Sequence, residues 1–205
     1  MTPRSYDASR RQEASGERRE EVLEAARKVL ASEGDEAFSI EEIAKRAGVS
    51  RMTVYNLFGS KARLLEELFD SLSQRAEFTT MGPLLAQSDS EQALDDVIAL
   101  FGRFWTKSRV AHRRLNAAAV DDDELATAMA SRNERRRNLL LALTKRILEQ
   151  RAIDTTPRTT GDVVRALFML SSFDSFDTLA GPDRTPVQVT PLVQRLARAV
   201  FDSIP

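Results

Sequence analysis

The sequence predicts an all-α fold in which a small N-terminal three-helix domain precedes a larger helical domain. Apolar residues recur at intervals of three and four along most of the chain, which is the spacing of one helix face. Ser, Thr or Asp stands before several of these runs as a helix N-cap. No stretch alternates apolar and polar residues as a half-buried strand does. Helices are therefore expected throughout.

The composition is that of a soluble globular protein, with 42% hydrophobic and 30% charged residues in a chain of 205. The absence of cysteine excludes disulfides and thiolate metal sites. No run is long and apolar enough to span a membrane, and residues 1–20 lack the apolar core of a signal peptide, so we expect a cytoplasmic protein. A net charge of -1 argues against indiscriminate coating of nucleic acid.

The first helix is expected to follow a polar tail. Residues 1–16 have almost no large apolar side chains and predict a disordered, mildly basic segment, for which a solvated terminus is favoured over a minor-groove arm. From Glu17 a helix is predicted to run to Gly34. Its apolar positions at helical spacing are Val22, Ala25, Ala26, Val29 and Leu30.

Residues 39–58 predict two short helices joined by a tight turn. Ser39 and Glu42 have the spacing of a capping box, Gly48 can adopt the left-handed conformation of the turn, and Ser50 caps the second helix. One face of this second helix is apolar and faces the domain. The exposed face carries Arg51, Met52, Thr53, Tyr55 and Asn56.

A pair of short helices can be purely structural, as in many all-helical domains, and the local charge favours DNA binding over that interpretation. Between Ile43 and Leu65 there are five basic residues and no acidic one, namely Lys45, Arg46, Arg51, Lys61 and Arg63. A positive strip with exposed polar side chains suits phosphates and base edges in the major groove. The next helix is predicted to run to about Phe78, and Lys61 is expected in its first turn, where a phosphate would relieve its unfavourable position. DNA binding is therefore the favoured interpretation.

The same segment carries a family resemblance. AGVSRMTVYNLFGSKARLL, residues 47–65, resembles the turn, recognition helix and following helix of TetR-type transcriptional repressors, and the resemblance extends over about residues 17–78. It implies phosphate contacts from Tyr55 and Lys61, whereas Leu57 stands where the family often has a phosphate-binding His or Tyr. The predicted DNA-binding residues are Ser39, Arg51, Met52, Thr53, Tyr55, Asn56 and Lys61.

Met81-Gly82-Pro83 breaks the helical pattern and predicts a boundary between a DNA-binding domain at 17–80 and a second domain at 81–205. Five helices are expected in the second domain. The first is capped by Ser88 with Glu91, the second covers 110–120 and contains a partly exposed His112, and the third runs from the acidic run 121–124 to about Ala152. The fourth covers 163–179, and the last starts at Thr190 and Pro191.

The helix expected at 163–179 is apolar on more than one side and must be covered on both. It predicts a homodimer formed with the last helix, with interface residues Val164, Phe168, Phe173, Leu192, Leu196 and Val200. A small apolar or aromatic effector is expected among Phe101, Phe104, Trp105, Met129, Asn133, Phe168 and Ser172. Arg132 or Arg136 would add a preference for anions if its side chain points inward.

No catalytic, metal or cofactor motif stands out, so the protein is not expected to be an enzyme or to need a cofactor. The acidic run at 121–124 is interpreted as a solvated helix cap rather than a metal site. The resemblance implies a repressor that leaves a palindromic operator when a small molecule binds. The alternatives are a helical protein-interaction module and an enzyme acting on a small apolar substrate.

Overall fold

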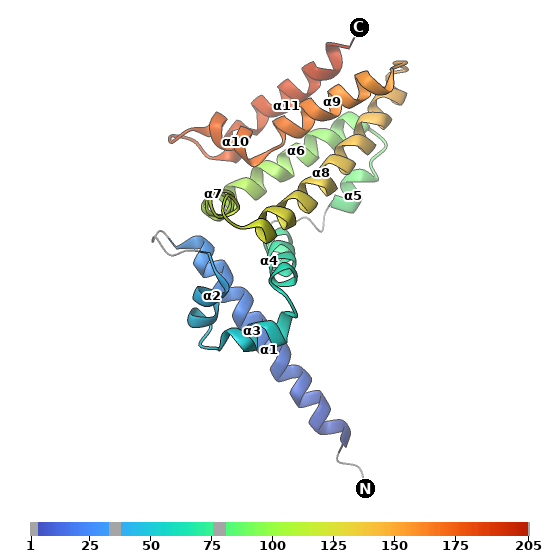
Figure 1. Cartoon of the computed structure of the whole chain (residues 1–205). Coiled ribbons are helices and arrows are strands. Elements are labelled where there is room, and N and C mark those ends of the chain that lie inside the picture. The colour runs from blue at the N-terminus through green and yellow to red at the C-terminus, as the bar shows by residue number, and fades with distance from the viewer. Residues whose placement is uncertain (1–3, 33–37, 76–80, 205) are drawn as a thin grey trace. The chain divides into compact units, whose positions relative to one another are not determined.

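The computed structural model describes residues 4–32, 38–75 and 81–204, and in these ranges the chain forms helices and turns without a strand. The all-α prediction is confirmed. The helices shown in Figure 1 are α1 (Arg4–Ala31), α2 (Ile40–Arg46), α3 (Arg51–Phe58), α4 (Lys61–Arg75), α5 (Met81–Leu85), α6 (Ser90–Lys107), α7 (Arg109–Ala118), α8 (Asp123–Gln150), α9 (Pro157–Leu170), α10 (Phe173–Ala180) and α11 (Pro186–Asp202).

The chain divides into two compact units. The first unit contains residues 1–71 and 113–128, and the second contains residues 72–112 and 129–205. This division differs from the predicted boundary at residue 80, because the end of α7 and the start of α8 belong to the first unit. None of the described helices is long and apolar enough to cross a membrane.

Helix α1 begins at Arg4, whereas the sequence predicts a disordered tail over residues 1–16. The correction has a simple cause. Extending an existing helix costs little per residue, and this segment is rich in the helix formers Arg, Glu, Gln and Ala. The part of the helix that packs against the domain is the buried stretch from Val22 to Leu30. Gly34, the predicted end of the helix, and the predicted end of α4 near Phe78 lie outside the described residues.

Two predicted helix starts and one predicted break are wrong. Asp89, not Ser88, caps α6, and its carboxylate accepts hydrogen bonds from the N–H groups of Glu91 and Gln92, both at 3.0 Å. Helix α11 begins at Pro186, so Pro191 lies inside the helix rather than at its first position. Residues 81–85 form the short helix α5, because proline is tolerated within a first helical turn.

The single helix predicted over 163–179 is two helices, α9 and α10. Ser172 interrupts it, because its hydroxyl oxygen accepts a hydrogen bond from the N–H of Ser175 at 3.1 Å and so starts a new helix. The apolar residues on both sides of this break hid the cap signal in the sequence.

The core of the second unit lies between α6, α9 and α11, which run side by side (Figure 1). Gly102 lets α6 and α11 approach closely, because a Cβ atom there would lie 2.1 Å from the hydroxyl oxygen of Thr190. Helix α6 directs aromatic side chains into this core, and all of Phe101, Phe104 and Trp105 are buried.

Candidate functional site

The predicted pair of short helices is present in the first unit. Helices α2 and α3 flank Gly48, whose φ of +66° is the left-handed conformation expected of the turn. Ser50 caps α3 as predicted, and its hydroxyl oxygen accepts a hydrogen bond from the N–H of Thr53 at 3.0 Å. Val54 and Phe58 are buried, so one face of α3 is anchored and the opposite face is presented outward.

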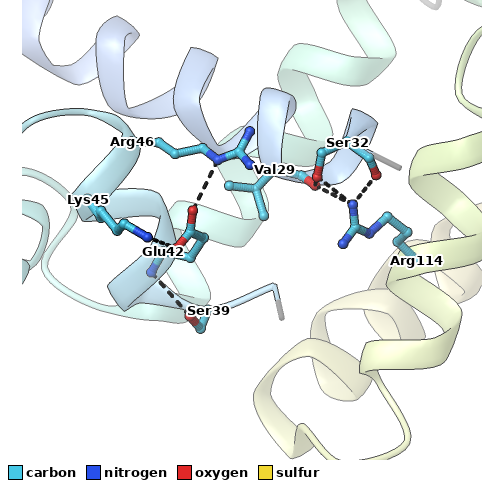
Figure 2. Close-up of polar contacts among 7 residues, drawn as sticks. All are labelled: Val29, Ser32, Ser39, Glu42, Lys45, Arg46 and Arg114. Carbon is cyan, nitrogen blue, oxygen red and sulfur yellow. Dashed lines mark hydrogen bonds and ion pairs between the residues drawn. The ribbon is translucent and has the colours of Figure 1, made fainter. Parts of the chain in front are cut away.

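The cap of α2 is only half of the predicted capping box. Ser39 accepts a hydrogen bond from the N–H of Glu42 at 3.2 Å. The Glu42 carboxylate does not return this bond, because it accepts hydrogen bonds from Arg46 at 3.1 Å and from Lys45 at 3.4 Å (Figure 2). The Arg46 hydrogen bond is the main cause that lowers the pKa of Glu42. Ser39 is therefore a helix cap that lies partly buried at the start of α2.

The outward face of α3 carries residues expected to contact DNA. Arg51 and Asn56 are exposed, and Met52 and Tyr55 are 66% and 36% exposed. Arg51 forms no ion pair within the described part of the chain. Thr53 is partly buried, and its hydroxyl lies 2.9 Å from that of Ser50. The structure therefore brings together on one surface four of the five predicted side chains and leaves Thr53 at its edge.

Arg19 holds this helix in place and was not recognised in the sequence. Its guanidinium donates to both carboxylate oxygens of Glu67 and to the backbone oxygen of Leu57, and it lies 4.5 Å from the centroid of the Phe58 ring. Hydrogen bonding with Glu67 raises the pKa of Arg19, so the charge is secure. Arg19 thus joins α1 to α4 and to the last turn of α3.

The positive strip between Ile43 and Leu65 contains no acidic residue, but an acidic residue from another part of the chain neutralises one of its charges. Lys61 forms an ion pair with Asp122, and the two side chains are 21% and 17% exposed. Burial opposes ionisation of Asp122, but the hydrogen bonds from Lys61 and from the N–H of Leu125 lower the pKa of Asp122 below its ordinary value. Asp122 precedes α8 and belongs to the first unit. Lys61 therefore has an internal anionic partner besides any phosphate.

Arg114, from the end of α7, closes the C-terminus of α1 in the same unit. Its Nη1 atom donates to the backbone oxygen of Val29 at 3.0 Å, to the backbone oxygen of Ser32, and to the hydroxyl of Ser32 at 2.6 Å (Figure 2). A cation at this end of a helix also interacts favourably with the helix dipole. Arg114 therefore ties α7 to the domain that carries α3.

Comparison with known proteins identifies this domain. The family described as bacterial regulatory proteins, tetR family, matches residues 22–68, which include α2 and α3. Residues 22–68 therefore form a TetR-type N-terminal domain. The helix-turn-helix transcriptional regulators ArpR and TtgR of Pseudomonas putida are 35% and 34% identical to the chain over 86 residues, which are 42% of this chain and 39% of each regulator.

The chain thus spans about two fifths of the length of the curated relatives it matches. The fold is similar to that of NalD, the secondary repressor of the MexAB-OprM multidrug efflux pump in Pseudomonas aeruginosa. That likeness has a TM-score of 0.63 and 24% identity, and it covers 92% of this chain and 96% of NalD. The N-terminal helix-turn-helix domain followed by a helical domain is the TetR-family architecture.

The second unit contains the aromatic residues expected around an effector. The ring centroids of Phe101 and Trp105 are 5.9 Å apart in a stacked arrangement, and those of Phe104 and Trp105 are 4.6 Å apart. Trp105 donates its indole N–H to the backbone oxygen of Ser171 at 3.1 Å. Trp105 therefore has its polar contact with Ser171. Ser172, which was predicted to line the effector site, is the partly buried N-cap of α10.

The remaining predicted effector residues are less buried than this cluster. Met129 and Phe168 are partly buried, and Asn133 is exposed. Phe173 was predicted only at the dimer interface, but its ring lies 5.7 Å from that of Trp105 within the core. Composition alone could not show that Phe173 faces inward.

His112 is buried, which corrects the expectation of a partly exposed histidine. Its ring centroid lies 4.6 Å from that of Trp105 in an edge-on arrangement, and its Nδ1 lies 3.1 Å from the backbone oxygen of Ser108. Burial, with a smaller contribution from the charge of Arg136, lowers the pKa of His112 to about 4 despite the hydrogen bond with Ser108. His112 is therefore neutral near pH 7 and donates from Nδ1.

The predicted interface residues fall into two groups. Val164 and Phe173 are buried within the chain itself, so they are not available to a partner subunit. Phe168, Leu192 and Val200 are partly buried, and Leu196 is 39% exposed. A separate pocket of about 390 Å³ lies between α8 and α9, and its lining residues are Leu141, Lys145, Thr155, Pro157, Thr160 and Gly161. It shares no residue with the aromatic cluster.

Proposed function

We propose that this TetR-family chain is a dimeric transcriptional repressor that binds a palindromic operator through α3. A small apolar or aromatic effector binds in the second unit and releases the operator. The observation that carries the proposal is the outward face of α3, where Arg51 and Asn56 are exposed on a helix whose other side is buried. Such a helix can enter a major groove and offer hydrogen bonds to base edges.

The positive charge around α3 supports a duplex as the partner. Arg51 and Arg63 have no ion-pair partner within the described residues, while Lys61 is paired with Asp122. Tyr55, which is exposed on α3, and Lys61 at the start of α4 are the candidate phosphate contacts. NalD, which has a similar fold, is a repressor, and this supports repression over activation.

Two helices of the second unit support a dimer. Helices α9 and α11 pack against each other, and Met169 on α9 is 58% exposed while Leu196 on α11 is 39% exposed. With the partly exposed Leu192 and Val200, these residues can pair with their symmetry mates across a two-fold axis. A two-fold dimer requires a pseudo-palindromic site with half-sites about 34–36 Å apart, or at a multiple of that spacing.

The test is competition binding by fluorescence anisotropy with a duplex selected for binding to the purified chain. Specific binding should survive an excess of random duplex, and Lys61→Ala should lower affinity for every sequence. Arg158→Ala is the matched control, because Arg158 is an exposed arginine on α9 in the other unit. Random duplex that competes as well as the selected site would contradict the proposal. Turnover of a small molecule without any DNA binding would favour an enzyme instead.

A further inference from the structure

We infer that the effector is an anion, namely an aromatic or apolar carboxylate, whose carboxylate group pairs with Arg136 of α8. This inference rests on the proposed function, because it names the ligand class of the proposed effector site. It depends on the burial of Arg136, on the hydrogen bonds of its guanidinium, and on the aromatic rings around it.

Arg136 is a buried cation without a hydrogen-bonded carboxylate among the described residues. The residue is 9% exposed. Its Nη1 donates to the backbone oxygen of Ser171 at 2.9 Å, and its Nη2 donates to the side-chain oxygen of Asn133 at 3.2 Å. Its Nε is buried and has no hydrogen-bond partner within the described ranges. A buried charge of this kind is costly unless an opposite charge and hydrogen bonds compensate it.

The surroundings of the guanidinium provide little negative charge. Asp174 is the carboxylate whose charge favours the protonated form, but its side chain is exposed, and the nearby Arg137 adds a second positive charge. Burial lowers the pKa of Arg136 to about 10, which still leaves the group charged at neutral pH. His112 is neutral there and supplies no charge. A bound anion would therefore compensate Arg136.

The free edge of the guanidinium has the shape that a carboxylate recognises. Nη1 is committed to Ser171, so the remaining edge is formed by Nε and Nη2. Two parallel N–H donors of this kind bind a carboxylate through both oxygens. Asn133 occupies only Nη2, and because its side chain is exposed, its amide can turn toward solvent.

Aromatic rings lie beside the same guanidinium and indicate the chemistry of the rest of the ligand. The guanidinium carbon of Arg136 lies 4.2 Å from the centroid of the Phe168 ring and 6.0 Å from that of Phe101. The Ser171 oxygen accepts from both Arg136 and Trp105, so the cation and the indole share one acceptor. Phe168, whose ring lies over the cation, is only partly buried, so this ring is accessible to a ligand.

Matched acid and amide pairs test the charge requirement on the full-length wild-type protein. We would use naphthalene-1-acetate, 4-phenylbutyrate and octanoate, each with its neutral amide, at up to millimolar concentration. The measurements are the rise in melting temperature and the release of operator. At least one acid should bind about tenfold or more tightly than its amide, as expected for a hydrogen bond to a charged group. The Nε–H resonance of Arg136 should shift with the acid and not with the amide.

Arg136→Met removes the cation while keeping an apolar side chain, and should abolish the preference for acid over amide. Arg137→Gln is the control, because Arg137 also lies over the Phe168 ring, at 4.3 Å, but its side chain is 40% exposed. The Arg137→Gln variant should still bind the acid more tightly than the amide. If Arg136→Met does not fold, the acid and amide comparison and the Nε–H resonance of the wild type decide the question.

Three results would overturn the inference: equal binding of acid and amide, unchanged acid binding by Arg136→Met, or no binding by any acid while operator binding is intact. Loss of operator binding by the untreated wild type would refute the proposed function instead. Because the melting temperature is measured without DNA, the two failures are distinguishable.

Discussion

Asp122→Asn should strengthen operator binding, because it frees Lys61 for a DNA phosphate. In the present structure the Lys61 ammonium is paired with the Asp122 carboxylate, and this carboxylate competes with any phosphate for the same cation. Asparagine caps a helix about as well as aspartate, so the cap that Asp122 provides to the N–H of Leu125 at 3.1 Å should be kept. The substitution therefore removes the charge with little effect on α8.

The size of the effect follows from the exposure of the pair. Side chains that are 21% and 17% exposed form an ion pair at the upper end of the surface range. Its loss is worth about 1 kcal/mol. That energy corresponds to about a fivefold change in affinity for one subunit, and to about 25-fold for a dimer that uses both lysines. Each lysine that gains a phosphate should also steepen the dependence of log affinity on log salt by about 0.9.

The assay is operator titration at several salt concentrations for the wild type, Asp122→Asn, Lys61→Met and the double variant. The gain should disappear in the Lys61→Met background, because no cation remains to be freed. An equal gain with and without Lys61 would show that Asp122 acts only through long-range charge. Unchanged affinity of Asp122→Asn in the wild-type background would refute the reasoning.

Three further predictions follow from single side chains. Arg19→Met should destabilise the first unit by about 1–2 kcal/mol in denaturant unfolding, because Glu67 and the Leu57 oxygen lose their donor, and it should weaken operator binding without changing base preference. His112 has a pKa of about 4 in the folded state and near the ordinary 6.5 in the unfolded state. The free energy of unfolding therefore decreases as pH falls from 6.5 to 4. This decrease in the free energy of unfolding is at most about 3 kcal/mol. A His112→Phe variant that lost as much stability in acid as the wild type would contradict the prediction. Leu196→Glu should yield a folded monomer by sedimentation at micromolar concentration, whereas Val187→Glu, nine positions away on the opposite face of α11, should stay dimeric.

Local signals in the sequence predicted the parts of the fold that depend on neighbouring residues. Ser50 capping α3 and Gly48 at a positive φ both follow from hydrogen bonds and backbone preferences within a few residues. The break at Ser172 was missed because apolar residues continue on both sides of it, and the start of α11 was missed because Pro191 resembled a first helical position.

Contacts between distant residues account for what the sequence did not predict at the site. Lys61 and Asp122 are 61 positions apart, and the acidic run near Asp122 resembled an ordinary helix cap. Arg114 reaches the end of α1 from a segment that the sequence placed in the other domain. Arg136 interrupts an apolar helix face, and only the packing of α8 against the end of α9 shows that its side chain points inward.

The central claim is that α3 recognises bases, and selection from a random duplex library by the wild type, Arg51→Ala and Asn56→Ala tests it most directly. The wild type should enrich a pseudo-palindrome with half-sites about 34–36 Å apart or at a multiple of that spacing. Each variant should lose preference at a base pair in each half-site, at a cost of about 1–3 kcal/mol. If the wild type enriched no sequence, or both variants enriched the wild-type motif unchanged, α3 would not be the recognition helix.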